Sequence, residues 1–481
     1  MLQLQNLIDG EHRAAAAGVT FDAWEPAVGR VYAQAPESGA GDVDSAVGAA
    51  KRAFPGWRSL PAADRSLWLN RLADLVQRDA DALAEAESRD TGKPLSLART
   101  LDVPRAIANL RFFAGAATQF ASEAHAMEAG AINYTLRQPH GVVACISPWN
   151  LPLYLLTWKI APALAAGNCV VAKPSEVTPL TASLFAGLCI EAGLPAGVLN
   201  ILHGHGAGVG QAIVSHPGVR AISFTGGTVT GRHIAAAAAP HFKKLSLELG
   251  GKNPTLVFAD ADFDAALAGT VRAAFANQGE ICLCGSRVLV EKSIYATFCD
   301  ALVERVKALR VGDPLEPETE QGALVSAAHL DKVLGAVAAA RADGGRVLCG
   351  GERARVEGER CREGWFMQPT VIDGLSAGSR ANQEEIFGPV ATLLPFETEA
   401  EAIEIANCTA YGLAASLWSR DVQRCHRVAA ELESGLVWVN TWMLRDLRTP
   451  MGGVKHSGQG REGGFEAMRF FTEPRNVCVK Y

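Results

Sequence analysis

The stretch from Ala274 to Glu291 reads AFANQGEICLCGSRVLVE and contains two cysteines, Cys282 and Cys284. A helical run, a break at Gly279, a short turn with the thiols and a strand rich in β-branched residues follow one another there. A thiol in such a turn lies at the end of an element, where a substrate can reach it. Cysteine chemistry also needs a thiolate whose pKa is lowered by nearby positive charge or a helix terminus. Taken alone, the stretch also fits two small buried apolar residues, the usual state of a free cysteine.

Two further side chains could support attack of a thiol on a carbonyl carbon. Glu248 lies in the apolar run 245–249, where burial would raise its pKa and make it a plausible general base. Asn150 follows Trp149 at a predicted strand–helix turn, and its amide could donate to an oxyanion beside the backbone N–H of Cys282. The alternatives are a structural carboxylate for Glu248 and a helix cap for Asn150.

The elements that must position these residues alternate along the chain. Short β-branched runs predict buried strands at 141–146, 168–172, 198–202 and 221–224. Helical patterns lie between and after them at 151–165, 178–192 and 227–239. This alternation predicts a parallel, doubly wound, Rossmann-like sheet with its ligand at the carboxyl ends of the strands. Earlier helices at 42–57, 62–78 and 97–120 are expected to cover one face of that sheet.

A glycine-rich loop, 225–231, joins a predicted strand to a helix. Glycines allow the backbone to approach a phosphate, and the helix N-terminus supplies N–H donors. The G-x-G-x-x-G spacing is absent, so an ordinary turn is the alternative. Lys173 and Glu176 follow another strand and could hold the ribose hydroxyls of a nucleotide, or form a solvated surface pair.

Length and composition limit the class of protein. At 481 residues, two or three domains are expected. The net charge of −6 has no basic block, which argues against nucleic acid and anionic membranes as partners. No stretch reaches the ~20 apolar residues that span a bilayer. Eleven cysteines without paired spacing indicate a reducing compartment, so we expect the cytoplasm, and no metal-ligand spacing is present.

Several short windows around Cys282 form a recognisable series. They are SPWN at 147–150, AKPSE at 172–176, FTGG at 224–227, LELGGK at 247–252 and EEIFGP at 384–389. Together they resemble the aldehyde dehydrogenase superfamily, over nearly the whole chain from Ile8 to Glu462. In that pattern the nucleophile follows Gly-Glu-Xaa, which matches Cys282 and leaves Cys284 as a neighbour.

The resemblance implies oxidation of an aldehyde with NAD, through a thiohemiacetal and a thioester on Cys282. It implies that Asn150 stabilises the oxyanion and that Glu248 activates the water that hydrolyses the thioester. A carboxylate at Glu176 would repel a 2′-phosphate, which favours NAD over NADP. The implied cofactor contacts are Ile146, Ser147, Trp149, Lys173, Ser175, Glu176, Gly206, Phe224, Gly226, Gly227, Leu249, Glu385 and Phe387.

Two arginines suggest the substrate. Arg105 and Arg445 stand where much of the superfamily has apolar pocket residues, and together they could bind a carboxylate remote from the aldehyde; the alternative is two surface salt bridges. The windows 279–284 and 440–450 resemble the 2-aminomuconate and 2-hydroxymuconate semialdehyde dehydrogenases of tryptophan (kynurenine) or other aromatic catabolism. We therefore expect 2-aminomuconate 6-semialdehyde first, its hydroxy analogue next, and broad aldehyde specificity as a further alternative. Met451 departs from the Phe usual at its position.

By the same resemblance, residues 1–120 and 141–250 form the NAD-binding domain and 251–470 a second α/β, catalytic domain. Residues 121–140 and 471–481 form a small β arm that builds a homo-oligomer, either a dimer or a tetramer. Two other classes of function remain open. A coenzyme A-acylating enzyme generally lacks the glutamate matched by Glu248, and a non-catalytic binding protein has no need of Cys282, Glu248 and Asn150 together.

Overall fold

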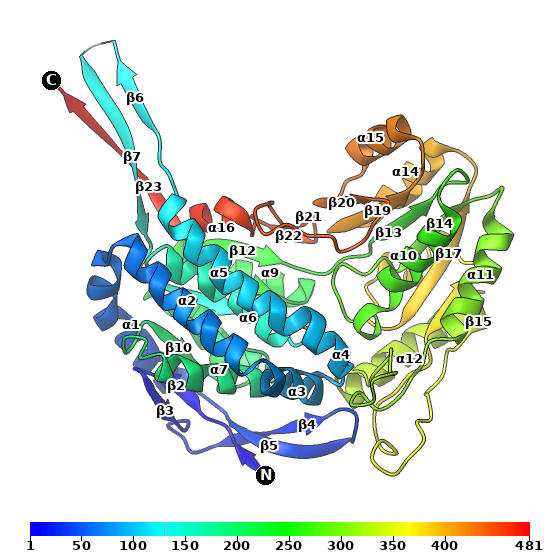
Figure 1. The fold of residues 1–481 in the computed structure, drawn as a ribbon, viewed down its shortest axis with the longest axis horizontal. Helices are drawn as coiled ribbons and strands as arrows, with labels where there is room; N and C mark the ends of the chain where they lie inside the picture. Colours follow the sequence, from blue (N-terminus) through cyan, green and yellow to red (C-terminus); the bar gives the residue numbers. More distant parts are fainter. Residues whose placement is uncertain (129) are drawn as a thin grey trace.

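The computed structural model describes residues 1–128 and 130–481, and its core is built on two large sheets (Figure 1). The first sheet has eight strands, in the spatial order β22 (Gly458–Gln459), β12 (Lys244–Glu248), β11 (Val219–Thr225), β8 (Val142–Ile146), β9 (Cys169–Lys173), β10 (Leu199–Ile201), β2 (Asn6–Ile8) and β3 (Glu11–Arg13). The five strands from β12 to β10 are parallel, as the alternation of elements predicted. The strand β12, which holds Glu248, was not predicted as a separate strand.

Two groups of helices cover this sheet. One group has α6 and α7 next to the sheet with α2, α3 and α5 outside, and the other has α1, α8 and α9. Right-handed crossovers place them on opposite faces, since the chain moves from β8 to β10 in one direction and then returns to β11 and β12. The helices are α1 (Ala40–Ser59), α2 (Ala62–Arg78), α3 (Ala80–Thr91), α5 (Val103–Gln119), α6 (Pro152–Ala165), α7 (Leu180–Glu191), α8 (Gln211–Ser215) and α9 (Thr228–Ala238).

The helix predicted over 97–120 departs from a simple α-helix. Its start divides into a short α4 (Leu95–Leu97), a π-helix over Ala98–Asp102, and then α5. Pro104 has no N–H to donate, so a regular α-helical ladder cannot continue through this point.

The second sheet has seven strands, in the order β15 (Arg346–Cys349), β16 (Thr370–Asp373), β17 (Val390–Phe396), β14 (Arg287–Glu291), β13 (Pro254–Val257), β19 (Ala414–Trp418) and β20 (Leu436–Val439). Both of its faces are buried, because Val288 and Val290 belong to one apolar cluster and Leu289 between them belongs to another. The helices are α10 (Phe263–Phe275), α11 (Tyr295–Lys307), α12 (Ala327–Ala342), α13 (Arg380–Gln383), α14 (Glu399–Asn407) and α15 (Val422–Glu431).

Part of the predicted second domain, 251–470, contacts the first sheet. Strand β22 pairs antiparallel with β12, and α16 (Gly464–Phe470) packs against α6. The bounds of the domains remain a prediction. The smaller elements are β1 (Leu2–Gln3), β4 (Thr20–Glu25) and β5 (Arg30–Pro36), which form one sheet, and β18 (Tyr411–Gly412) and β21 (Val454–Lys455), which form another.

A three-stranded arm projects from the body (Figure 1). It consists of β6 (Ala124–Met127), β7 (Ala131–Pro139) and β23 (Thr472–Lys480), with β7 in the middle. The strands therefore fall within the two segments predicted for the arm, 121–140 and 471–481; residue 129 lies outside the described residues.

Within residues 1–128 and 130–481, no helix has both the length and the apolar character needed to cross a bilayer. In the same part of the chain, no three His, Cys, Asp or Glu side chains gather as metal ligands.

Candidate active site

Four neighbouring parallel strands of the first sheet end at the same edge, and Asn150, Glu248 and most of the predicted cofactor residues lie at or just after those ends. Glu248 at the end of β12 is level with Thr225 of β11. Phe224 is level with Ile146 of β8, and Ile146 is level with Lys173 of β9. The turns after these strands are therefore brought together by the register of the sheet alone.

A cleft of ≈ 690 Å³ lies along this edge, between β8, β9 and β11 and the start of α9. It is lined by ten of the residues for which a cofactor contact was implied: Ile146, Ser147, Trp149, Lys173, Ser175, Glu176, Gly206, Phe224, Gly226 and Gly227. A Cβ added at Gly227 would meet nothing within 4 Å, so the backbone at the N-terminus of α9 is open to a ligand.

Two charges face each other in the cleft. Lys173 Nζ donates to Glu176 Oε2 at 2.7 Å, and Glu176 Oε1 accepts from Gly206 N at 3.5 Å. Burial opposes ionisation, but the Lys173 ammonium outweighs it and holds the pKa of Glu176 below its ordinary value. The carboxylate is therefore charged at neutral pH, with the cation beside it partly neutralising it.

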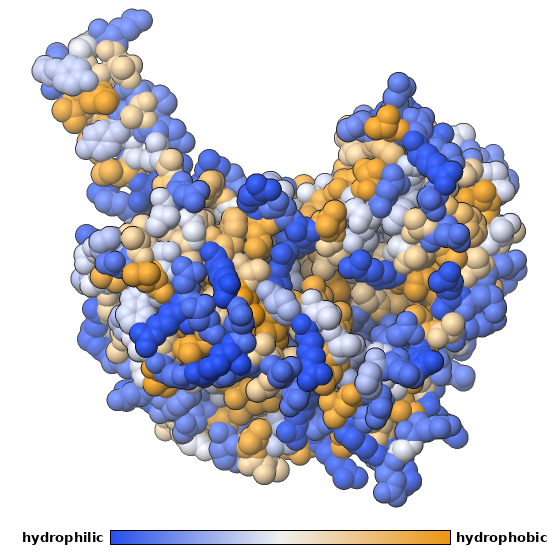
Figure 2. Space-filling model, in the orientation of Figure 1, coloured by the Kyte–Doolittle hydropathy of each residue, from blue (hydrophilic) through white to orange (hydrophobic). Residues whose placement is uncertain are grey.

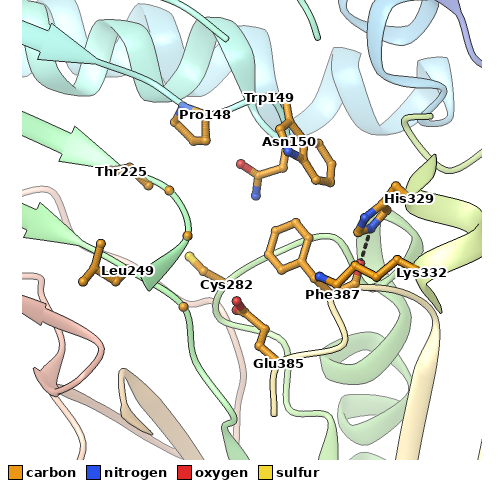
Figure 3. Close-up of a pocket in the computed structure, with 13 residues that line it drawn as sticks. Pro148, Trp149, Asn150, Thr225, Leu249, Cys282, His329, Lys332, Glu385 and Phe387 are labelled. Atoms are coloured by element: carbon orange, nitrogen blue, oxygen red, sulfur yellow. Dashed lines mark hydrogen bonds between the residues drawn. The ribbon is translucent and has the colours of Figure 1, made fainter. Parts of the chain in front are cut away.

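A second chamber adjoins the cleft and shares five of its lining residues, Pro148, Trp149, Thr225, Gly226 and Gly227. Figure 3 shows Asn150, Cys282 and Glu385 reaching this chamber from three different elements. Leu249 and Phe387 complete the set that the sequence placed here. All thirteen residues with an implied cofactor contact thus line two joined cavities.

The loop before β14 presents one of the two cysteines to the chamber. Cys282 lines it and is partly exposed, whereas Cys284 is buried, with Sγ 3.9 Å from Ala276 O. Asn253 Nδ2 donates to Cys282 O at 2.7 Å and to Cys284 O at 2.9 Å, which fixes the loop. The geometry therefore distinguishes two thiols that the sequence stretch alone could not.

The expectation of a lowered thiol pKa is wrong for the protein alone. Burial raises the pKa of Cys282, and the carboxyl groups of Glu385 and Glu248 add to the effect. The Arg445 guanidinium acts in the opposite direction but is outweighed. Desolvation and the two carboxyl groups therefore favour the protonated thiol, and Arg445 only partly compensates for them.

Asn150 is anchored from both sides of the chamber. Its Nδ2 donates to Glu280 O at 2.8 Å, and its backbone carbonyl accepts from Lys93 Nζ at 2.9 Å. The alternative role as a helix cap is not observed, because Leu151 occupies the cap position of α6 without a side-chain bond. The Asn150 amide instead has a second N–H available beside the Cys282 loop.

Glu248 ends β12 with only 3% of its surface exposed, and neither carboxyl oxygen has a hydrogen-bond partner among the described residues. Burial raises the pKa of Glu248 well above its ordinary value, and the Glu462 carboxyl raises it further. Three cations lower the pKa but are outweighed: Lys159, Arg461 and Arg445. A satisfied structural carboxylate is therefore not what the structure contains. An acid in this state can accept a proton once it ionises.

The two arginines lie along one face of α6. The Arg105 guanidinium stacks over Tyr154 at 5.5 Å and the Arg445 guanidinium over Trp158 at 5.6 Å, one helical turn further on. Among the described residues, neither guanidinium has a carboxylate within 4 Å. Within the described residues, neither Arg105 nor Arg445 therefore forms the surface salt bridge that was the alternative for both.

Two residues of α12 in the chamber were not found from the sequence. His329 and Lys332 both line it, and His329 Nε2 lies 2.6 Å from Phe387 O (Figure 3). The His329 ring also packs edge-on against Trp149 at 5.2 Å. The sequence around them marks only a helix start at Ser326, so nothing local indicated that this helix reaches the site.

Comparison with known proteins gives a full-length match. A 2-aminomuconic semialdehyde dehydrogenase of Mus musculus is 50% identical over 100% of this chain and 99% of its own. A 2-hydroxymuconic semialdehyde dehydrogenase of Pseudomonas sp. (strain CF600) is 46% identical over 100% of both chains. PnpE from Pseudomonas sp. WBC-3, solved in complex with nicotinamide adenine dinucleotide, is 43% identical, with a TM-score of 0.97 over 100% of this chain and 98% of its own. The family model described as "Aldehyde dehydrogenase family" matches residues 13–477, and this chain belongs to that family.

Proposed function

We propose that this aldehyde dehydrogenase oxidises 2-aminomuconate 6-semialdehyde to 2-aminomuconate with NAD, in the breakdown of tryptophan by the kynurenine route or of another aromatic compound. The observation that carries the choice of substrate is the pair Arg105 and Arg445, stacked along α6 without a carboxylate partner among the described residues. The name of the 50% identical mouse relative agrees with an acidic semialdehyde.

The cleft fits NAD. Lys173 and Glu176 would hold ribose hydroxyls, the glycines before α9 leave room for the pyrophosphate, and Glu385 and Phe387 would hold the nicotinamide end. The charged Glu176 disfavours a 2′-phosphate, which supports NAD over NADP. When bound, NAD supplies a positively charged ring and the acceptor for the hydride that leaves the substrate carbon.

The first half of the reaction belongs to Cys282 and Asn150. The Cys282 thiol loses its proton to solvent, its sulfur adds to the aldehyde carbon, and the electron pair of the C=O bond moves to the oxygen, which becomes an oxyanion. The Asn150 amide and the backbone N–H of Cys282 would donate to that oxygen, which lowers the barrier to the adduct. Loss of hydride from the adduct leaves a thioester on Cys282.

The second half belongs to Glu248. A water molecule must attack the thioester, and a base must take its proton. Glu248 is close enough to Cys282 to raise the pKa of the thiol, and its carboxylate can accept the proton of the water once it is ionised. Collapse of the second tetrahedral adduct releases the carboxylate product and restores the thiol.

A second substrate has a specific observation in its favour. The 46% identical Pseudomonas relative is named for 2-hydroxymuconic semialdehyde, whose 2-substituent is the same size as the amino group. The same two arginines would bind its carboxylate. The unpartnered Glu248 favours hydrolysis over transfer of the acyl group to coenzyme A for either substrate.

Three further assignments concern the domains, the assembly and the location of the protein. We assign 1–120 and 141–250 to cofactor binding and 251–470 to catalysis, and we propose that the arm joins copies of the chain into a dimer or tetramer. Figure 2 shows apolar side chains on the surface of the arm, and Met127, Leu136 and Val479 are exposed there. The eleven free cysteines support a reducing compartment, the cytoplasm.

The test compares kcat/KM for 2-hydroxymuconate semialdehyde and for hexanal in wild type, Arg105→Ala and Arg445→Ala. Each substitution should cost ~1.5–3 kcal/mol of transition-state binding, or about 10- to 150-fold, on the acidic substrate beyond any loss on hexanal, since Arg445 also acts on the pKa of Cys282. Arg111→Ala serves as the control, because Arg111 lies on the same helix, α5, but bonds to Asp74 and Gln77. An equal loss on hexanal, or no loss on the semialdehyde, would reject the carboxylate clamp.

A further inference from the structure

A buried lysine holds the backbone of Asn150. Lys93 follows α3, and its side chain has no exposed surface. Its Nζ donates to Asn150 O at 2.9 Å and to Asp102 Oδ1 at 3.0 Å. Asp102, the last residue of the π-helix, is equally buried. The turn that bears Asn150 is therefore tied to an ion pair with no access to water.

A third ionisable residue contacts the other end of the same turn. Glu87 of α3 accepts through Oε1 from Leu153 N at 3.1 Å, in the first turn of α6. Burial and the Asp102 carboxylate raise the pKa of Glu87 to about 8, while Lys93 opposes them. Burial likewise raises the pKa of Asp102, and the Lys93 ammonium that donates to it opposes the rise.

Stability alone is a poor reason for such a cluster. The cost of removing two charges from water can match or exceed their attraction, so an apolar replacement of similar volume is often as stable. What the pair does provide is a fixed position for Lys93 Nζ, which is held between one carboxylate and one carbonyl oxygen. π-Helical segments, such as the one that carries Asp102, are often found at functional sites.

The contacts of Asn150 show which groups the fixed position of Lys93 Nζ can influence. Asn277 Nδ2 lies 3.3 Å from Asn150 O and 3.2 Å from Glu280 O, and the Asn150 amide itself donates to Glu280 O at 2.8 Å. Glu280 precedes Cys282 by two residues. Lys93 is thus the fixed, charged end of a chain of contacts that runs through Asn150 to the loop of the nucleophile.

We propose that Lys93 is a positioning residue, which fixes the backbone of Asn150 so that the Asn150 amide meets the oxyanion formed at Cys282. The inference rests on the proposed role of Asn150. A positioning role differs from a purely structural one. Loss of the Lys93 side chain should slow the formation of the thioester without weakening the binding of NAD or aldehyde.

The experiment is a single turnover followed by stopped flow, with full-length protein in excess over 2-hydroxymuconate semialdehyde and with saturating NAD. In Lys93→Met, the rate constant for NADH formation should fall about 10- to 100-fold, part of the value of an oxyanion donor. The KM values for NAD and aldehyde should stay within about threefold. If Lys93→Met folds poorly, the double variant Lys93→Met with Asp102→Asn replaces it, because this variant does not leave the Asp102 carboxylate buried and unpaired. The double variant should show the same fall in the rate of NADH formation.

Lys243→Met is the matched control. Lys243 is also buried and lines neither cavity; among the described residues it donates to the carbonyl oxygens of Val214, which lines the cofactor cleft, and of His216. Its replacement should lower the melting temperature but leave the single turnover at the wild-type rate. A slow single turnover in this control would mean that loss of any buried lysine disturbs the site, and would overturn the proposal.

A double-mutant cycle decides whether Lys93 acts through Asn150. In an Asn150→Ala background, Lys93→Met should slow the single turnover by less than about twofold, because there is no amide left to position. Two results would overturn the positioning role alone. One is that Lys93→Met slows the single turnover as much in the Asn150→Ala background as in wild type. The other is a wild-type rate in Lys93→Met with Asp102→Asn. A wild-type rate in Asn150→Ala would instead reject the oxyanion role proposed for Asn150, a distinct result.

Discussion

At the scale of single residues, burial disfavours the charged form of both reacting groups before ligands bind. Burial raises the pKa values of both the Cys282 thiol and the Glu248 carboxyl, and each carboxyl near the thiol makes its ionisation harder. The opposing cation, Arg445, is also the residue proposed to bind the substrate. A bound positive nicotinamide ring would favour the thiolate, so the site should become reactive only when it is loaded.

The two neighbouring cysteines should differ sharply in function. Cys282→Ala should lower kcat by at least about 10³-fold, because the variant cannot form a thioester. Cys284→Ala should keep kcat within about threefold and cost ~1 kcal/mol of stability, because it removes a small buried group. Steady-state NADH production and thermal unfolding of both variants give the comparison. A dead Cys284 variant with an active Cys282 variant would reverse the assignment.

Glu248 should govern hydrolysis and its dependence on pH. Glu248→Gln should leave the first turnover within about threefold and lower the steady-state rate by ~10²–10⁴-fold. Because the pKa of Glu248 is raised, the acid form persists as the pH rises past its ordinary value, and only the ionised form can accept a proton. The wild-type steady-state rate should therefore increase with pH toward that raised pKa, and this limb should vanish in the variant.

The first turnover separates hydrolysis from hydride transfer in this variant. Equal loss of the first turnover and of the steady-state rate would remove Glu248 from the role of base.

At the scale of elements, the nucleophile loop is built on unusual backbone conformations. Asn277, Gln278 and Gly279 follow one another at φ of 52°, 54° and 70°. A Cβ at Gly279 would also overlap Gly388 O of a neighbouring loop, so only glycine fits. The loop can therefore turn back toward Asn150 and place Cys282 in the chamber.

Gly279→Ala tests this element. It should cost more than ~2 kcal/mol of stability and slow the first turnover, because backbone must shift close to Cys282. Gly193→Ala is the control, since Gly193 has nearly the same φ, 69°, but a Cβ there would meet nothing within 4 Å. That variant should lose only about 1 kcal/mol in denaturant unfolding and keep the wild-type turnover. Similar effects of the two substitutions would show that φ alone, not contact with Gly388, limits residue 279.

At the scale of the whole molecule, the site exists only where two sheets meet. Asn150 and Glu248 come from the ends of first-sheet strands, whereas Cys282 and Glu385 come from loops of the second sheet. The arm is separate from the site and has exposed apolar residues that no part of its own sheet covers. Its role is therefore expected in assembly and not in chemistry.

Charges on the arm should test the assembly. Leu136→Asp combined with Val479→Asp should reduce the mass measured by light scattering at micromolar concentration, because buried unpaired carboxylates disfavour an apolar interface. Leu67→Asp is the control, since Leu67 is an exposed leucine on α2, outside the arm. An unchanged mass for the arm variant, or a monomeric wild type, would argue against this surface as the interface.

The sequence by itself determined four of the five parallel strands of the first sheet, the helices between them and the residues at their ends. This was possible because buried strands and helices differ in apolar periodicity, and because a parallel sheet places successive carboxyl ends at one edge. Two predicted strands end at Ile146 and Phe224 and a third ends directly before Lys173, and all three residues line one cleft. The motifs around Cys282 and Glu248 then indicated the family.

The tertiary structure alone decided features that depend on contacts between distant segments. One such feature is the exposure of Cys282 and the burial of Cys284, which depend on what packs against their loop. Others are the place of His329 beside Phe387 and the bond from Lys93 to Asn150 O, which join residues of separate elements. The raised pKa of Cys282 likewise follows from burial among groups far apart in the chain. Local periodicity carries no record of such neighbours, since packing and desolvation are properties of the folded chain.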